Sequence, residues 1–324
     1  LHQTATEADG RLEREERFSE ALSGLEEQLA DLPSFTEVDR YLLSNNDIPA
    51  EALAKLDTGK APRSSYLSSD ASKIQVFVLF GLDGVDSSDS VMLVALDRVH
   101  QKIKLISLAR DSYVFIPEFA SFSKLAYSYT WGGAAMAVKN LNYNYYLNVS
   151  DYIAVDFEQL AQIIDRIGGV TVNIDEDEAR YLFNYPNVHV GDCLLDGKTA
   201  VSYARIRKSS ATDSDRKRTG RQREVILSIL NTLQTMPLSQ YPGFVRDCLG
   251  MCATSFEAET LLTMAAETLG QNYTVEQYFF PEGQVEWWGG LIKEYFYYVY
   301  DLRRASDRIY RIIYEELYIS GYDD

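Results

Sequence analysis

Three nearly continuous apolar runs predict the core of a sheet. The first, IQVFVLFGLD, covers residues 74–83, and the next two, VMLVALD and KIKLISLARD, cover 91–97 and 102–111. Apolar runs of this length with few polar interruptions are typical of strands that are buried on both faces. Only the short turn RVHQ separates the second run from the third, so we expect these two strands to be antiparallel neighbours.

Apolar residues at helical spacing predict helices on either side of these strands. Such spacing runs through 11–32, 34–56, 131–145, 156–169, 196–207, 213–234, 255–269 and 301–317. The pair Gly168 and Gly169 ends one of these helices ahead of the strand VTVNID. Helices and strands that alternate in this way indicate an α/β fold, a layered α-β-α arrangement with a central mixed sheet flanked by helices.

The segment TGKAPRSSYLSSDASK, residues 58–73, is rich in Ser, Pro and Gly and predicts a linker. It divides the chain into an N-terminal helical segment with its linker, residues 1–70, and one larger domain, residues 71–324. The sequence begins at Leu1 without a signal-like segment, and no run approaches the ~20 apolar residues that cross a bilayer. We therefore expect a trimmed extracellular domain.

Charge narrows the classes of function. The formal net charge of −17 and the pI near 4.7 argue against a protein that coats nucleic acid, which needs a broad basic surface. One stretch, YARIRKSSATDSDRKRTGRQREV over 203–225, nevertheless concentrates basic residues. We interpret it as a focused anion site, and a solvated charged helix remains the alternative.

Cysteine and histidine do not indicate a metal centre. The cysteines Cys193, Cys248 and Cys252 lack zinc-site spacing, and the histidines His2, His100 and His189 are scattered. One disulfide with one free thiol, or three thiols that serve only in packing, are both compatible with this spacing.

Charged residues stand where the predicted strands end. Asp83 closes the first strand, Asp89 precedes the second, and Arg110 and Asp111 close the third. Ligands of α/β sheets gather at strand ends, and two carboxylates on neighbouring strands are suitable ligands for Mg²⁺. Asp is also a common turn former, so a purely structural role for Asp83 and Asp89 stays open at this point.

The basic stretch offers several planar guanidinium groups. Arg218 and Arg221 are three apart and share a face of a helix, whereas Arg205 and Arg207 share a face only on a strand. A guanidinium group bonds two phosphate oxygens at once, and several together neutralise a pyrophosphate.

Seven motifs in order resemble the LytR-CpsA-Psr family of cell-wall glycopolymer transferases. They are VFVLFGLD, SSDSVMLVALD, KIKLISLARDSYV, KLAYSYTWGG, DYIAVDFEQLAQIIDRIGGVTVNI, LDGKTAVSYARIR and DSDRKRTGRQREVI. The resemblance is close over residues 74–232 and looser beyond. It implies an extracytoplasmic enzyme, tethered to the membrane of a Gram-positive type bacterium by an N-terminal anchor. Such an enzyme uses Mg²⁺ to move a glycopolymer from a polyprenyl pyrophosphate carrier onto peptidoglycan.

The resemblance also implies roles for individual residues. The metal ligands would be Asp83 and Asp89. The catalytic residues would be Arg110, Arg205, Arg218 and Asp215, the last as a base or as a group that orients arginine. The substrate-binding residues would be Asp111, Lys124, Arg207, Arg221 and Gln222. Lys124 serves equally well in a structural ion pair.

Two departures from the family pattern bear on activity. Ser87 stands where many relatives carry Arg, and Val114 stands where some carry a second Arg. Hydrolysis of a pyrophosphate, and non-catalytic binding of a polyprenyl-linked glycan, are therefore the alternative functions. If the basic stretch holds a pyrophosphate, we expect Arg205, Arg218 and Gln222 to converge with Arg110, and Lys208, Lys217 and Arg223 to face solvent.

Overall fold

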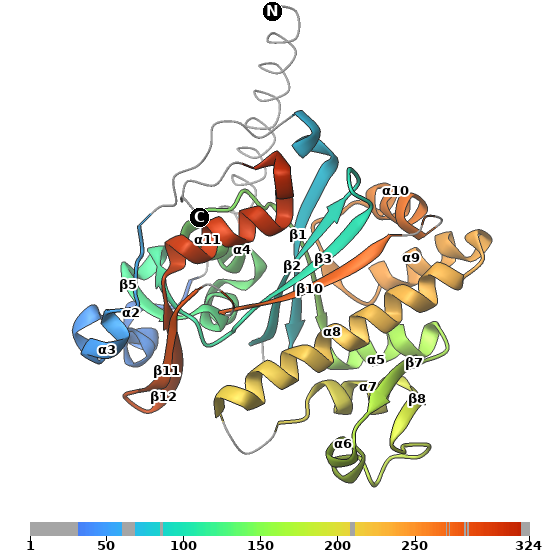
Figure 1. The fold of residues 1–324 in the computed structure, drawn as a ribbon, viewed down its shortest axis with the longest axis horizontal. Helices are drawn as coiled ribbons and strands as arrows, with labels where there is room; N and C mark the ends of the chain where they lie inside the picture. The colour runs from blue at the N-terminus through green and yellow to red at the C-terminus, as the bar shows by residue number, and fades with distance from the viewer. Residues whose placement is uncertain are drawn as a thin grey trace, which may run out of the picture.

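The computed structural model has a layered α/β fold built on one mixed sheet, as predicted. The structure describes residues 32–59, 69–84, 87–207, 211–269, 271, 273–281, 283 and 285–318. The sheet has six strands in the order β10-β3-β2-β1-β6-β9 (Figure 1). These strands are β1 Ile74–Leu82, β2 Ser88–Asp97, β3 Lys102–Leu108, β6 Asp151–Asp156, β9 Ala253–Thr254 and β10 Thr274–Phe280.

Strand β2 runs antiparallel to both of its neighbours, β1 and β3. This confirms the prediction that the second and third apolar runs form antiparallel strands. Strand β6 is parallel to β1 and β10 is parallel to β3. The start of β2 therefore lies at the same end of the sheet as the final residues of β1, β3, β6 and β10.

Helices cover both faces of the sheet. Their bounds are α2 Phe35–Val38, α3 Ala50–Leu53, α4 Leu125–Tyr145, α5 Phe157–Arg166, α6 Glu176–Tyr181, α7 Gly197–Ala204, α8 Ala211–Thr235, α9 Tyr241–Leu249, α10 Ala258–Leu269 and α11 Leu302–Tyr314. Val91 and Leu93 of β2 join the core that includes α4 and α11, whereas Met92 and Val94 join the core beneath α8 and α10. Figure 1 shows these two helical layers on opposite sides of the sheet. The apolar run is continuous because both faces of β2 are buried.

Three two-stranded ribbons extend from the layers. They are β4 Tyr113–Ile116 with β5 Ser121–Lys124, β7 Val170–Ile174 with β8 Gly191–Leu195, and β11 Trp287–Ile292 with β12 Tyr295–Tyr300. Short 3₁₀ turns complete the described secondary structure: η1 Asp39–Tyr41, η2 Asn45–Asp47, η3 Ser69–Lys73, η4 Pro117–Phe119, η5 Leu238–Gln240 and η6 Glu315–Leu317. Among the described residues, no helix is long and apolar enough to cross a membrane.

The predicted short helical stretch over 34–56 forms α2 and α3 with 3₁₀ turns between them. Its apolar residues pack into the main body: Leu43 bridges Phe122, and Ile48 shares a core with Tyr297. This segment therefore buries its apolar side chains against the β4–β5 and β11–β12 ribbons. The helix predicted over 11–32 lies, apart from Leu32, outside the described residues, as does most of the predicted linker.

All three cysteines are free thiols in this structure. Cys193 is buried, and burial raises the pKa of the half-buried Cys248 thiol to about 12. A thiol that is held protonated in this way reacts slowly. The structure thus agrees with the reading in which the cysteines serve in packing.

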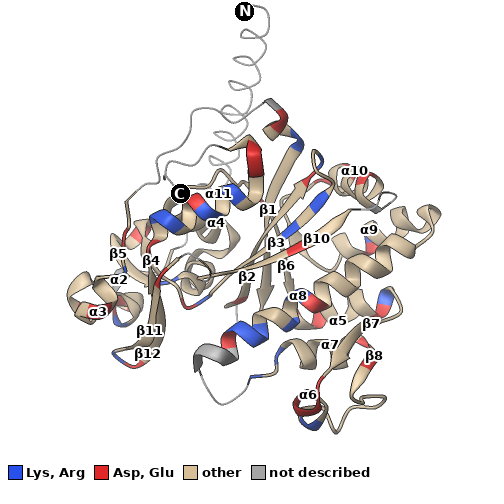
Figure 2. Cartoon of the chain, viewed as in Figure 1, with Lys and Arg blue, Asp and Glu red and all other residues tan. Residues whose placement is uncertain are grey.

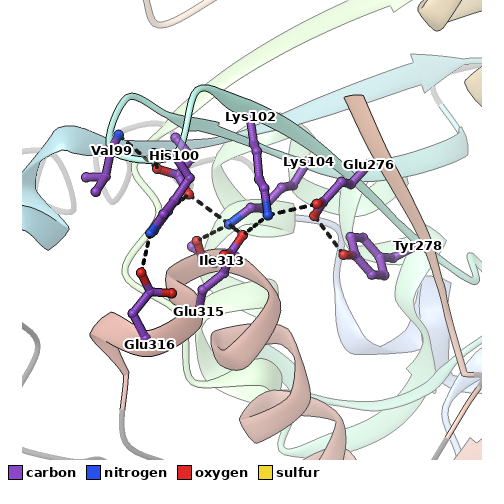
Figure 3. Close-up of polar contacts among 10 residues, drawn as sticks. Val99, His100, Lys102, Lys104, Glu276, Tyr278, Ile313, Glu315 and Glu316 are labelled. Atoms are coloured by element: carbon purple, nitrogen blue, oxygen red, sulfur yellow. Dashed lines mark hydrogen bonds and ion pairs between the residues drawn. The ribbon is translucent and has the colours of Figure 1, made fainter. Parts of the chain in front are cut away.

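A network of charged residues joins α11 and η6 to the sheet, near the first residues of β3 (Figure 3). Lys104 of β3 is fully buried, and its ammonium lies 2.8 Å from a carboxylate oxygen of Asp97 and 2.8 Å from one of Glu315. It also donates a hydrogen bond of 3.0 Å to the carbonyl of Ile313. Buried charge is tolerated only when it is paired and hydrogen-bonded, so the contacts to Asp97, α11 and η6 together allow Lys104 to lie in the core.

His100 completes this network. Its Nδ1 lies 2.6 Å from Asp97 Oδ2, and its Nε2 lies 2.7 Å from Glu316 Oε1. The hydrogen bond with Asp97 is the main cause that raises the pKa of His100. Side-chain atoms of Asp97, His100 and Glu315 lie within 4.8 Å of one another, as metal ligands do, but the Lys104 ammonium already lies between the two carboxylates.

We predict that His100 makes stability depend on pH. Because its pKa is raised in the folded state, its contribution is complete below the unfolded value of ~6.5 and is lost as pH rises through the folded value. Urea unfolding of wild type and His100→Gln, from pH 5.5 to 9, should show a wild-type advantage on the order of 1 kcal/mol at the acid end that shrinks as pH rises. Glu316→Gln, which removes one partner, should flatten the trend, and a pH-independent difference would contradict this assignment.

Candidate active site

Charged residues predicted at strand ends meet at one end of the sheet. Leu82 of β1 pairs with Ser88 of β2, and Val91 of β2 pairs with Leu108 of β3. Asp83, Asp89 and Arg110 therefore project from three adjacent strands. The site is built from elements that the cores on both faces hold rigidly.

Hydrogen bonds join Asp83, after β1, to Ser87, before β2. The amide of Asp83 donates to the carbonyl of Ser87 at 3.0 Å, and the amide of Ser87 donates to Asp83 Oδ1 at 3.2 Å. Gly84 has a φ of +83°, a conformation that favours glycine. Asp83 is thus held beside the start of β2, and Ser87 adds no positive charge here.

Three arginines converge on Asp89. Arg110 Nη1 donates to Asp89 Oδ1, and Arg207 Nη2 lies 3.5 Å from the same oxygen. Arg218 Nη2 lies 3.5 Å from the backbone carbonyl of Asp89. Arg110 comes from the end of β3, Arg207 from the segment after α7, and Arg218 from α8. The structure therefore brings together basic residues that are far apart in the chain.

Helix α8 contributes the most deeply buried charged side chains of this site. Asp215 Oδ1 accepts from Arg218 Nη2 one turn later, and both side chains are buried. Figure 2 shows Lys and Arg gathered along the first half of α8, the half that approaches the sheet end. The predicted helical spacing of these residues is confirmed.

Several buried polar atoms at this site have no hydrogen-bond partner in the described part of the chain. They are Arg110 Nε, Asp215 Oδ2 and Arg218 Nε, and Gln222 Oε1, one turn further along α8, is also buried without such a partner. Buried polar atoms are nearly always paired, because leaving one unpaired costs about 1–3 kcal/mol. A bound polar ligand would supply the missing partners, so their concentration at one place points to a binding site.

The arginines also raise one another's electrostatic energy. Burial lowers the pKa of the Arg110 guanidinium, and the nearby charge of Arg218 lowers it further. Burial and Arg218 likewise lower the pKa of Arg207. Crowded cations of this kind favour an anion between them, because the anion offsets their repulsion.

Asp111 and Lys124 form an ion pair beside this cluster. Lys124 Nζ lies 2.6 Å from Asp111 Oδ1, and 5.6 and 5.3 Å from the ring centres of Tyr295 and Tyr297. The backbone amide of Tyr298 donates to the carbonyl of Asp111 at 2.9 Å. This pair therefore joins the end of β3 to the β11–β12 ribbon, as the structural alternative for Lys124 predicts.

The remaining basic residues of 203–225 differ in their exposure and in their contacts. Arg205 is exposed, with its guanidinium carbon 4.4 Å from the ring centre of Phe157. Lys217 is exposed, as expected, and Lys208 lies outside the described residues. The expectation for Arg223 is wrong: its guanidinium donates to Ser107 at 2.9 Å and to Gln277 at 3.2 Å. The physical reason is that Arg223 lies on the face of α8 that packs on β3 and β10.

Arg221 is directed toward α6. Its Nε lies 2.6 Å from Glu178 Oε1, and its Nη1 donates to the carbonyl of Ile206 at 3.0 Å. Sequence reasoning missed Glu178. The spacing of Asp175 and Glu178 is that of a capping box, which both side chains form here, but such a motif predicts a helix start and not a partner from another helix.

Comparison with known proteins agrees with this architecture. The chain matches the model of the LytR_cpsA_psr family over residues 46–310. It is 29% identical over 254 residues to the polyisoprenyl-teichoic acid–peptidoglycan teichoic acid transferase TagU of Oceanobacillus iheyensis, and the match covers 75% of each chain.

Solved structures share the fold. TagT bound to LIIa-WTA superposes with a TM-score of 0.63 at 19% identity, over 79% of this chain and 96% of that one. TagT with bound octaprenyl pyrophosphate lipid superposes with a TM-score of 0.59 at 17% identity, over 80% and 98%. Since the family model spans most of the sequence, the chain belongs to the LytR_cpsA_psr family.

Proposed function

We propose that this protein transfers a glycopolymer from a polyprenyl pyrophosphate carrier to peptidoglycan at the extracytoplasmic face of the membrane. The proposal is carried by the convergence of Arg110, Arg207 and Arg218 on one sheet end, where buried polar atoms lack hydrogen-bond partners within the described ranges. Family membership supports the reaction class, since a relative is named a teichoic acid transferase. A structural neighbour holds a polyprenyl pyrophosphate.

In this reaction a hydroxyl oxygen of the acceptor attacks the phosphorus that carries the glycopolymer. The new O–P bond replaces the bridging P–O bond of the pyrophosphate, and polyprenyl phosphate leaves. Negative charge spreads over the phosphoryl oxygens in the transition state, so catalysis rests on positioning and on neutralising this charge. The guanidinium groups of Arg110, Arg207 and Arg218 supply both.

Asp215 has two functions in this scheme. Its Oδ1 orients the buried Arg218, and its Oδ2, which has no hydrogen-bond partner among the described residues, accepts the proton of the attacking hydroxyl. A carboxylate that is already hydrogen-bonded through one oxygen is well held for this transfer.

The carboxylates of Asp83 and Asp89 fit Mg²⁺, since carboxylate oxygens are its preferred protein ligands. One oxygen of Asp89 is shared with Arg110 and Arg207, so phosphates that draw these arginines away would free it. When bound, Mg²⁺ would neutralise charge on the pyrophosphate oxygens. The dependence on Mg²⁺ is part of the proposal.

We predict that Asp83→Ala and Asp89→Ala each lower turnover by on the order of 100-fold and remove its dependence on Mg²⁺. Transfer to a peptidoglycan acceptor, measured across a Mg²⁺ titration, tests this, with thermal unfolding as the control for folding. Unchanged Mg²⁺ dependence in both variants would remove the metal assignment.

We predict that Arg218→Lys lowers transfer steeply, by roughly 100-fold, because lysine keeps the charge but lacks the planar fork. Arg205→Lys tests in the same way whether the exposed arginine contacts the substrate. Lys217→Ala, one residue from Arg218 and exposed, is the matched control and should change little. Equal, mild losses in all three variants would indicate a diffuse basic surface instead of a specific site.

The same assay separates the alternative functions. Release of free glycopolymer phosphate without an acceptor would identify a hydrolase. Tight binding of the carrier without turnover would identify a binding protein.

A further inference from the structure

The ion pair of Arg221 with Glu178 is almost completely buried and lies next to the candidate site. The two side chains are 4% and 9% exposed, and Arg221 Nε lies 2.6 Å from Glu178 Oε1. Arg221 is only three residues from Arg218 on α8. The two arginines nevertheless point to different partners, because Arg218 approaches Asp89 whereas Arg221 reaches α6.

The second hydrogen bond of Arg221 fixes the segment that carries Arg207. Arg221 Nη1 donates to the carbonyl of Ile206 at 3.0 Å. The Ile206 side chain is fully buried in a core that also contains Val225 of α8. The peptide unit that joins Ile206 to Arg207 is thus held through its carbonyl and through the preceding side chain, which limits where the Arg207 guanidinium can lie.

Glu178 is itself fixed at both oxygens. Its Oε2 accepts from the backbone amide of Asp175 at 2.9 Å, and its Oε1 accepts from Arg221. Asp175 directly follows β7, so the carboxylate is tied to the β7–β8 ribbon. A continuous set of hydrogen bonds therefore runs from this ribbon through Glu178 and Arg221 to the backbone beside Arg207.

We propose that Glu178 and Arg221 are positioning residues, which hold Arg207 at the anion site without touching the substrate. This inference rests on the proposed function, since it assigns Arg207 to the pyrophosphate. It replaces the implied role of Arg221 in direct substrate binding. The planar guanidinium is required because Nε and Nη1 bond two separate acceptors at once, which an ammonium on a flexible stem does not reproduce.

A double-mutant cycle with octaprenyl pyrophosphate as the probe tests the proposal. Glu178→Gln keeps the capping box, which accepts Glu or Gln, but removes the charge that orients Arg221. Calorimetric titration should show roughly tenfold weaker binding for Glu178→Gln than for wild type. In an Arg207→Ala background the same change should have less than about a twofold effect, because the residue through which it acts is gone.

Two further variants sharpen the cycle. Arg221→Lys should reproduce the loss seen for Glu178→Gln. Glu176→Gln, on the same helix but with a side chain that is 77% exposed, should bind as wild type does. Equal losses from Glu178→Gln in both backgrounds would reveal a general structural role and overturn the proposal, as would unchanged binding in the wild-type background.

Amide hydrogen exchange separates this inference from the proposed function. Glu178→Gln should speed exchange over residues 205–207, whereas Glu176→Gln should not. If wild type fails to bind octaprenyl pyrophosphate, the proposed function is wrong. The exchange rates then decide whether Glu178 and Arg221 hold the backbone beside Arg207. Unchanged rates in Glu178→Gln would overturn this inference.

Discussion

Three guanidinium groups lie close together at one end of the sheet, and the surrounding groups must offset their mutual repulsion. Arg110 and Arg207 approach the Asp89 carboxylate, and Arg218 approaches the Asp89 backbone carbonyl. Like charges stay this close only where neighbouring side chains hold them in place through ion pairs and hydrogen bonds. Asp215 holds Arg218, and Asp111 lies 3.6 Å from Arg110. In a chain with a formal net charge of −17, the fold thus gathers these arginines beside the carboxylates of Asp89, Asp111 and Asp215.

Helix α8 contributes both to the apolar core and to the charged site. Its first half carries Asp215 and Arg218 at the sheet end. Its second half places Ile226 and Leu230 against the strands. The apolar half anchors the helix, so burial of aliphatic side chains stabilises the position of the charged half.

The main features of the fold could be predicted from sequence because apolar runs report burial directly. The strands β1, β2 and β3 lie in 74–83, 91–97 and 102–111 or overlap them closely, and the charged residues that end these runs lie at the candidate site. Contacts set by tertiary packing could not be predicted. Glu178 meets Arg221 across 43 residues of sequence, and Arg223 meets Ser107 across 116. No local sequence pattern indicates which arginines of this polar stretch contact another helix or strand.

The fastening of Lys104 by the last described turn has a consequence for synthesis of the chain. Lys104 reaches the carbonyl of Ile313 across 209 residues, and β10, which covers the free edge of β3, also comes from the C-terminal part. When only the first half of the chain has left the ribosome, β3 therefore has an unpaired edge. The Lys104 ammonium then also lacks its partner in α11. The β3–β10 pairing and the Lys104 contact with α11 therefore form only after the C-terminal part has been synthesised.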